Sequence, residues 1–126
     1  MRWFGAPGSN MLLDSDQTRL SHMLEAAREV AGYVEGLSRT DLDASRPIQH
    51  SLVRCIEIMG EAASRLSADF RKAHADIPWQ DIIGMRNRLV HAYFDLDLDL
   101  IWQTAVEELP ILVVRLDQLI SGAETF

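Results

Sequence analysis

Apolar side chains recur every three or four residues along most of the chain, which is the spacing of one face of an α-helix. The first such stripe is formed by Leu20, Met23, Ala27, Val30, Val34 and Leu37. Asp14 can cap the start of this helix, with Gln17 three residues later as its capping-box partner. Gly36 and the polar stretch 38–40 are expected to end it.

A second stripe follows Pro47, a residue that suits the first turn of a helix. It consists of Ile48, Leu52, Cys55, Met59, Ala63 and Leu66. Gly60 inside this helix costs about 1 kcal/mol relative to alanine, and a close approach by another helix would justify that cost. Short turns are expected on either side, one capped by Thr40–Asp41 and one running from Ser67 to His74.

A third helix is expected to open at Pro78–Trp79 and to run to about Tyr93. The segment 95–100 alternates acidic and apolar residues, but no other segment offers it a strand partner, so we interpret it as an extended connection. Asp97 would cap a fourth helix, which Pro110 should kink. The apolar stripe of that helix is Ile101, Ala105, Leu109, Leu112, Leu116 and Leu119.

Four amphipathic helices with short connections predict an all-α fold, an up-and-down bundle of four main helices plus short helical turns. The 126 residues fit one domain, with a leader at 1–13, the bundle at 14–121 and a tail at 122–126. Met11 is an alternative to Met1 as the native start. A bundle of this size has a shallow core, which is compatible with a dimer formed through the remaining apolar surface.

The single cysteine excludes an intrachain disulfide and a cysteine-based metal cluster, and it fits a reducing compartment. The longest apolar stretch, 109–114, is too short to span a bilayer. The first ten residues lack the apolar core of a signal peptide. We therefore expect a cytoplasmic protein that does not engage a membrane.

The net charge of −7 argues at first against a nucleic-acid partner. The charge is unevenly distributed: residues 1–45 carry −3, residues 46–91 carry +2, and residues 92–126 carry −6. Eleven of the twelve cations are arginine, whose planar guanidinium can bind phosphate through two hydrogen bonds. Arginine richness is more often a matter of genome composition, however.

The third helix carries the candidate chemistry. If it is helical throughout, Asn87 and His91 share a face, whereas Arg86 and Tyr93 lie nearly in line two turns apart. Arg86 and His91 would then border one groove, and a second helix or a second copy of the chain would complete it. Arg88 lies beside this groove as a further candidate for lining it.

These residue types suit phosphodiester cleavage in RNA. His91 would act as general base for the ribose 2′-hydroxyl or as general acid for the leaving oxygen, and Arg86 would stabilise the charge of the transition state. Asn87 would orient the imidazole or bind a phosphate oxygen, and Tyr93 would contact substrate or carry a modification. The mechanism needs no metal and no cofactor, and DNA is not a substrate because it lacks the 2′-hydroxyl.

Spacing alone favours an ordinary helix surface, in which Arg86 pairs with Asp81 or another acidic neighbour and His91 is a C-terminal cation. On the second helix, Arg54, Glu57, Glu61 and Arg65 have the spacing of an ion-pair ladder, although Glu61 or Arg54 could instead line the cleft. The acidic residues at 95–99 resemble the opening of an EF-hand, but Leu100 and Val106 replace its required glycine and glutamate. Calcium binding is therefore not expected.

The run Arg86-x4-His91-x-Tyr93 resembles the R-x4-H-x-Y signature of HepT-like HEPN-domain toxins. The resemblance covers about residues 14–120 and includes further blocks at Gln49, 57–63, 77–79, 95–102 and 109–112. It implies an all-α bundle that dimerises and places both signature segments at a shared cleft. It also implies a metal-independent ribonuclease, with Arg86 and His91 as the catalytic pair and Asn87 in support.

The resemblance further implies that the protein is the toxin of a toxin–antitoxin pair. Its partner would be a minimal, MntA-like nucleotidyltransferase, which silences the toxin by adding AMP to the signature tyrosine, here Tyr93. Two alternatives remain open from the sequence. One is a non-catalytic helical module that binds a nucleotide or a protein in the same groove, and the other is that the chain is the antitoxin.

Overall fold

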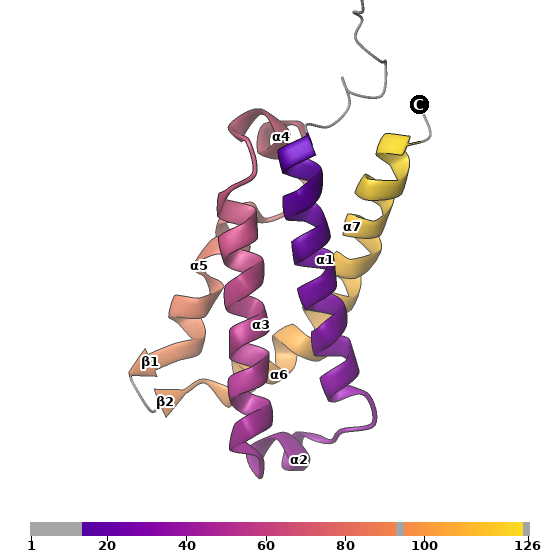
Figure 1. Cartoon of the computed structure of the whole chain (residues 1–126). Helices are drawn as coiled ribbons and strands as arrows, with labels where there is room; N and C mark the ends of the chain where they lie inside the picture. The colour runs from indigo at the N-terminus through magenta and orange to yellow at the C-terminus, as the bar shows by residue number, and fades with distance from the viewer. Residues whose placement is uncertain (1–13, 93–94, 125–126) are drawn as a thin grey trace, which may run out of the picture.

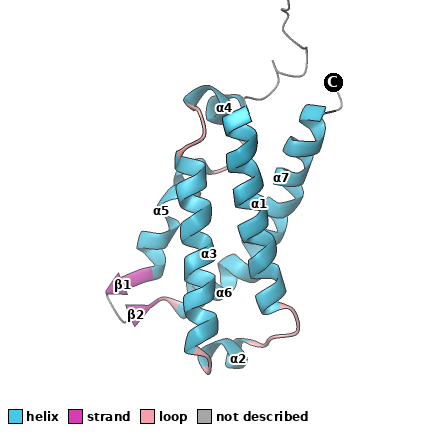
Figure 2. Ribbon diagram, viewed as in Figure 1, coloured by secondary structure: helices cyan, strands magenta, loops and turns pink. Residues whose placement is uncertain are grey.

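The computed structural model describes residues 14–92 and 95–124 and has the expected all-α architecture (Figure 1). Its α-helices are α1 (Asp14–Val34), α2 (Arg39–Asp43), α3 (Arg46–Ser64), α4 (Ala68–Ala73), α5 (Trp79–Leu89), α6 (Leu98–Gln103) and α7 (Leu109–Glu124). A π-helical turn at Thr104–Glu108 joins the last two. Two short strands, β1 (Val90–Ala92) and β2 (Asp95–Leu96), form an antiparallel hairpin after α5 (Figure 2).

The core lies where α1 packs against α3 and α7, while α5 covers the other side of α3 (Figure 1). The stripes read from the sequence supply it. The fully buried large side chains are Leu20, Met23, Val30, Leu42, Leu52, Cys55, Ile56, Met59, Leu89, Ile101 and Leu116. Burial of this apolar surface is the main stabilising term of the bundle.

Gly60 marks the closest approach between α3 and α5. A Cβ atom at this position would lie 3.1 Å from the carbonyl oxygen of Ile82 and 3.3 Å from that of Ile83. The missing side chain therefore lets the two backbones meet, and the prediction from the sequence is confirmed. This contact fixes the position of α5, the helix that carries the start of the signature.

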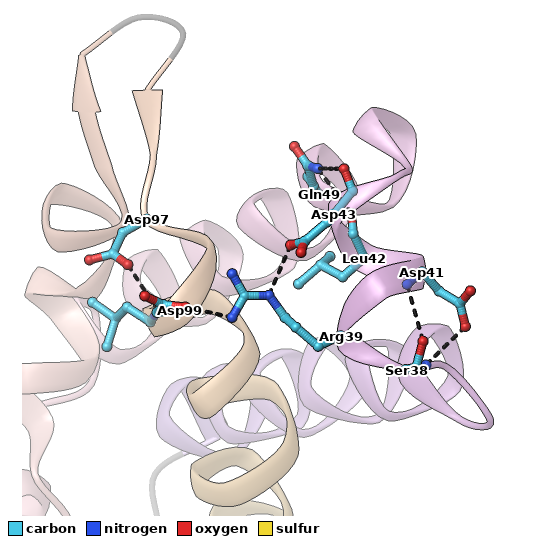
Figure 3. Close-up of polar contacts among 9 residues, drawn as sticks. Ser38, Arg39, Asp41, Leu42, Asp43, Gln49, Asp97 and Asp99 are labelled. Carbon is cyan, nitrogen blue, oxygen red and sulfur yellow. Dashed lines mark hydrogen bonds and ion pairs between the residues drawn. The ribbon is translucent and has the colours of Figure 1, made fainter.

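The predicted ends at Gly36 and Ser67 are confirmed, and the predicted cap of α2 is corrected. Gly36 has φ +76° directly after α1, and Ser67 caps α4 by accepting a hydrogen bond from Phe70 N. The cap of α2 is Ser38 rather than Thr40–Asp41, and Asp41 is its capping-box partner three residues into the helix (Figure 3). Ser38 takes this role because its backbone is extended, whereas Thr40 already lies inside the helix.

Two buried polar side chains tie the short helices to the bundle. Asp16 on α1 accepts hydrogen bonds from both the backbone N–H and the hydroxyl of Ser67, at 2.8 and 2.7 Å. Gln49 on α3 donates to the carbonyl of Leu42 at 2.9 Å (Figure 3). Both side chains are hydrogen-bonded, and these bonds offset the free energy needed to remove the polar groups from water.

The third helix is shorter than the sequence predicted. It ends at Leu89 rather than near Tyr93, and the segment interpreted as an extended connection supplies β2. Val90 adopts extended angles, φ −116° and ψ 103°, and pairs with Leu96. The carbonyl of Leu89 accepts from the backbone N–H of Asp97 at 2.8 Å, so the returning chain replaces the next helical hydrogen bond.

The last helix follows the prediction in outline. Asp97 caps α6 by accepting from Leu100 N, as expected. The irregularity at Pro110 is a π-helical turn directly before it, in which Leu109 N donates to the carbonyl of Thr104. Because proline has no N–H, the widened turn accommodates the missing bond. Within the described ranges, no helix is both long and apolar enough to cross a bilayer.

Candidate active site

The signature begins at the C-terminal end of α5, where Arg86, Asn87 and Arg88 are exposed. Arg86 Nε donates to Glu57 Oε2 on α3 at 3.2 Å. The other oxygen of the same carboxylate accepts from Arg54 Nη1 at 2.6 Å. Glu57 thus holds two guanidinium groups, and the Nη groups of Arg86 remain available to a ligand.

This arrangement decides between the interpretations of the second-helix charges. The Arg54–Glu57 pair confirms the first step of the predicted ladder, but the second partner of Glu57 is Arg86 on another helix. Spacing alone suggested that Arg86 pairs with Asp81 or another acidic neighbour; an acidic partner is confirmed, but it is Glu57 rather than Asp81. Glu61 is exposed, and its carboxylate contacts no cation among the residues that the structure describes; only its backbone carbonyl accepts, from Ser64 Oγ at 2.7 Å.

His91 does not lie on a helix. It sits in β1, where Val90 pairs with Leu96 and Ala92 with Asp95, so His91 is the extra residue of a β-bulge. The predicted helical face shared by Asn87 and His91 is accordingly wrong. Bulges turn a side chain out of the regular alternation and are common beside active sites. Here the imidazole is 54% exposed, and its Nε2 lies 3.5 Å from Asp97 Oδ2.

The remaining signature residues divide into three cases. The side chain of Asn87 is exposed and makes no hydrogen bond within residues 14–92 and 95–124. Arg88 lines a groove between α3, α5 and α7. Tyr93, the predicted modification site, lies outside the described residues.

The groove beside Arg88 has a volume of about 480 Å³. Its floor is apolar and comes from α3, α5 and α7. Arg88, Asp81 and Glu108 lie along it, and an ion pair joins Arg115 Nε to Asp76 Oδ2 at 2.7 Å. Ile111, also on its lining, is exposed to 69% and is followed one turn later by the exposed Val114.

The electrostatics of these sites differ. The hydrogen bond from Arg115 lowers the pKa of Asp76 below its usual range, so this pair is ionised at neutral pH. Near the signature, the guanidinium groups of Arg54 and Arg86 share one carboxylate, that of Glu57. No cluster of three or more histidine, cysteine, aspartate or glutamate side chains that could hold a metal occurs in the described part of the chain.

Sequence reasoning missed two partners of the signature. Glu57 was identified as a member of the ladder and of a family block, and Asp97 as a helix cap within another block, but neither was predicted to contact a signature residue. Both contacts join elements that are distant in the chain or depend on the hairpin. The available signal was the alternation at 95–100, which would have predicted β2 had the end of the third helix been paired with it.

Comparison with known proteins gives the family. The family model described as ribonuclease HepT-like matches residues 23–119. A Caldanaerobacter subterraneus subsp. tengcongensis protein named as a candidate RNase is 34% identical over 101 residues, which cover 80% of this chain and 90% of the relative. A Thermococcus cleftensis protein named as a probable ribonuclease HepT is 30% identical over 105 residues, covering 83% of this chain and 96% of the relative.

A Methanocaldococcus jannaschii protein, also named as a candidate RNase, is 32% identical over 91 residues, covering 72% of this chain and 84% of the relative. No solved structure matches significantly. The family match includes α5, the hairpin and the parts of α3 and α6 that contact them. The chain is therefore a member of the HepT-like ribonuclease family.

Proposed function

We propose that this protein is a metal-independent endoribonuclease toxin that cleaves RNA with Arg86 and His91. The observation that carries the proposal is the geometry at the end of α5 within a chain of this family. An arginine and a histidine are both more than half exposed there, and each is held by a carboxylate from another element. Because Arg86 and His91 are exposed and paired with carboxylates, an RNA chain can contact them without local unfolding of the protein.

In the proposed reaction the 2′-hydroxyl of the ribose attacks the adjacent phosphorus. His91 accepts the proton of that hydroxyl, the bond between O2′ and phosphorus forms, and the bond between phosphorus and O5′ breaks. The departing O5′ takes up a proton from a second acid, which His91 of another copy or water would supply. The products are a 2′,3′-cyclic phosphate and a 5′-hydroxyl. Arg86 would bind the non-bridging oxygens, whose charge grows in the transition state.

The proposed active form is a homodimer with a composite cleft. One chain supplies one Arg86 and one His91, which is half of an acid–base pair. The groove beside Arg88 supports a second copy as its occupant, because it combines an apolar floor, exposed Ile111 and Val114, and residues of both charge signs. Two copies related by a two-fold axis can pair such charges with each other.

The proposed regulator is a cognate MntA-like nucleotidyltransferase acting on Tyr93. This part of the proposal rests on the family resemblance and on the place of Tyr93 two residues after His91 in the chain. An AMP group on Tyr93 would bring a phosphate charge close in sequence to the groups that bind the substrate phosphate. Like charges there would oppose RNA binding.

The test of catalysis uses purified protein, total RNA and EDTA. Cleavage should persist in the chelator, and His91→Ala should reduce its rate by about 10²- to 10⁴-fold, the usual contribution of a positioned acid or base. DNA should remain intact. An RNA sample left untouched by the parent protein would instead favour a non-catalytic binding module.

Two further measurements test the assembly and the regulation. Light scattering should give the mass of a dimer, and a strict monomer would contradict the composite cleft. Expression of the chain alone should arrest growth, and the adjacent nucleotidyltransferase should relieve the arrest only while Tyr93 is present. If the neighbouring gene arrests growth and this chain relieves it, the roles of toxin and antitoxin are reversed.

A further inference from the structure

We propose that Asp97 is a positioning residue that holds the His91 imidazole in its working orientation. The inference deepens the proposed function and rests on it, because it assumes that His91 acts in catalysis. Asp97 was expected only to cap a helix. In the folded protein it joins that cap to the bulge that carries the histidine.

Asp97 makes three contacts, one through its backbone and two through its carboxylate. Its backbone N–H donates to the carbonyl of Leu89 at 2.8 Å, at the junction of α5 and β1. Its Oδ1 accepts from Leu100 N at 3.0 Å and caps α6. Its Oδ2 is left to face His91 Nε2 at 3.5 Å. The two oxygens thus have separate partners, and the cap sets the direction of the second oxygen.

The first turn of α6, which Asp97 caps, is also held in place. Asp99, in the first turn of α6, forms an ion pair with Arg39 Nη1 at 2.5 Å, and Arg39 Nε contacts Asp43 Oδ1 at 2.9 Å (Figure 3). Arg39 therefore links α6 to α2, and Gln49 links α2 to α3. The start of α6 is therefore held against the bundle.

The bulge makes an external partner necessary. A residue in regular β pairing has its orientation set by the pleat, but the extra residue of a bulge does not. His91 is half exposed, and its ring has no other polar partner within the described residues. A carboxylate facing Nε2 selects the nitrogen that carries hydrogen and leaves Nδ1 to accept a proton from substrate. It also balances the imidazolium that forms when that proton arrives.

Asp97→Asn separates the two roles of this residue. Asparagine caps helices as well as aspartate does, so α6 should keep its start and the Tm should be unchanged. The negative charge facing His91 is lost. We expect kcat to fall about 2- to 5-fold, the size of a partly exposed ion pair, with KM nearly unchanged. Asp97→Ser, which caps but is too short to reach His91, should behave alike.

Asp95→Asn is the matched control. It removes the same charge from the same hairpin at an exposed position whose carboxylate makes no contact with His91 within the described residues, so kcat should stay at the parent value. If Asp97 served only to cap α6, Asp97→Asn would leave both the Tm and kcat at the parent values. That result would overturn the inference, as would a rise in KM alone.

Combination with His91→Ala separates this inference from the proposed function. If Asp97 acts through His91, Asp97→Asn should reduce activity no further once His91 is absent. A residual activity that still falls upon Asp97→Asn would contradict the positioning role. If His91→Ala cleaves RNA as fast as the parent, the proposed function itself has failed. If His91→Ala is inactive and Asp97→Asn is fully active, only the positioning role has failed.

Discussion

The two ends of α5 belong to different parts of the molecule. At its start, Trp79 is buried and donates its indole N–H to the carbonyl of His74 at 3.0 Å, while the carbonyls of Ile82 and Ile83 press against Gly60. At its end, Arg86 is exposed and is held only by a side chain. The start of the helix is thus fixed by packing, and its end, which the buried Leu89 anchors to the core, presents charged side chains from that support.

Because of this division, we expect that substitutions can change the stability of the fold and the cleavage of RNA separately. Buried contacts at the start of α5 set its position relative to α3. Ion pairs that are partly open to water set the side chains at its end, and such pairs contribute little to folding. Substitutions at the exposed end should therefore alter cleavage without altering the Tm, whereas substitutions at the packed end should do the reverse.

Among substitutions on α5, Arg86→Ala should have the largest effect. Loss of the guanidinium that stabilises transition-state charge should lower kcat by about 10²- to 10³-fold. The Tm should stay close to that of the parent, because the Arg86 side chain is 51% exposed. Cleavage assays on RNA, together with thermal unfolding followed by circular dichroism, would measure both quantities.

Arg28→Ala is the control for Arg86→Ala. Arg28 on α1 also forms an exposed ion pair, with Asp117 on α7, and neither residue belongs to the candidate site. Its removal should leave both cleavage and the Tm unchanged. If Arg86→Ala unfolds the protein, the packed and exposed ends of α5 are not separable, and the comparison fails.

Gly60→Val tests the packed end. The new side chain would meet backbone carbonyls of α5 that cannot move without shifting the helix, and overpacking of this kind costs about 1–3 kcal/mol. The free energy of unfolding in urea should fall by this amount.

Gly32→Ala is the counterpart, since a Cβ at Gly32 meets nothing within 4 Å. Alanine there should stabilise α1 by about 0.5–1 kcal/mol. If Gly60→Val and Gly32→Ala changed the free energy of unfolding equally, the contact between α3 and α5 at Gly60 would not be a tight one.

The packed end of α5 was also the part that sequence reasoning predicted well. Apolar periodicity identifies the helices that form the core, and Gly60 correctly predicted a close contact, because both are local signals of burial. The cap at Asp97 was found for the same reason.

The exposed end was predicted less well. Its signature residues were identified by resemblance, but their geometry was assigned to a helix that ends at Leu89. A helical continuation and a hairpin compete for the same residues there. The outcome depends on β2, which pairs with β1. It also depends on the backbone N–H of Asp97, which donates to the carbonyl of Leu89. Tertiary pairing of this kind overrides local propensity and leaves little trace in spacing.

Glu57→Gln sharpens the comparison at the exposed end. Glutamine can still accept from Arg86 but loses the charge that holds both Arg86 and Arg54, so kcat should fall about 2- to 5-fold. Glu61→Gln, one turn along α3, should have a smaller effect because its carboxylate contacts neither arginine in the described structure. Activity measured at equal folded fraction decides the order. A larger loss at Glu61 would mean that Glu61, not Glu57, serves the site.

Labelling of the native Cys55 thiol reports how readily the packed part of α3 opens, without any substitution there. Burial, followed by the hydrogen bond to Glu29, raises the pKa of this thiol to about 12. Since the raised pKa favours the protonated thiol in the folded state, the associated stability is full below pH 9 and declines as pH rises toward 12. A thiol reagent at neutral pH should therefore label the folded protein far more slowly than the unfolded chain. Arg86→Ala should not change this rate, whereas Gly60→Val should raise it. Fast labelling of the parent protein would show that the core of α3 opens readily, and α5 would then lose the rigid support that its exposed end requires.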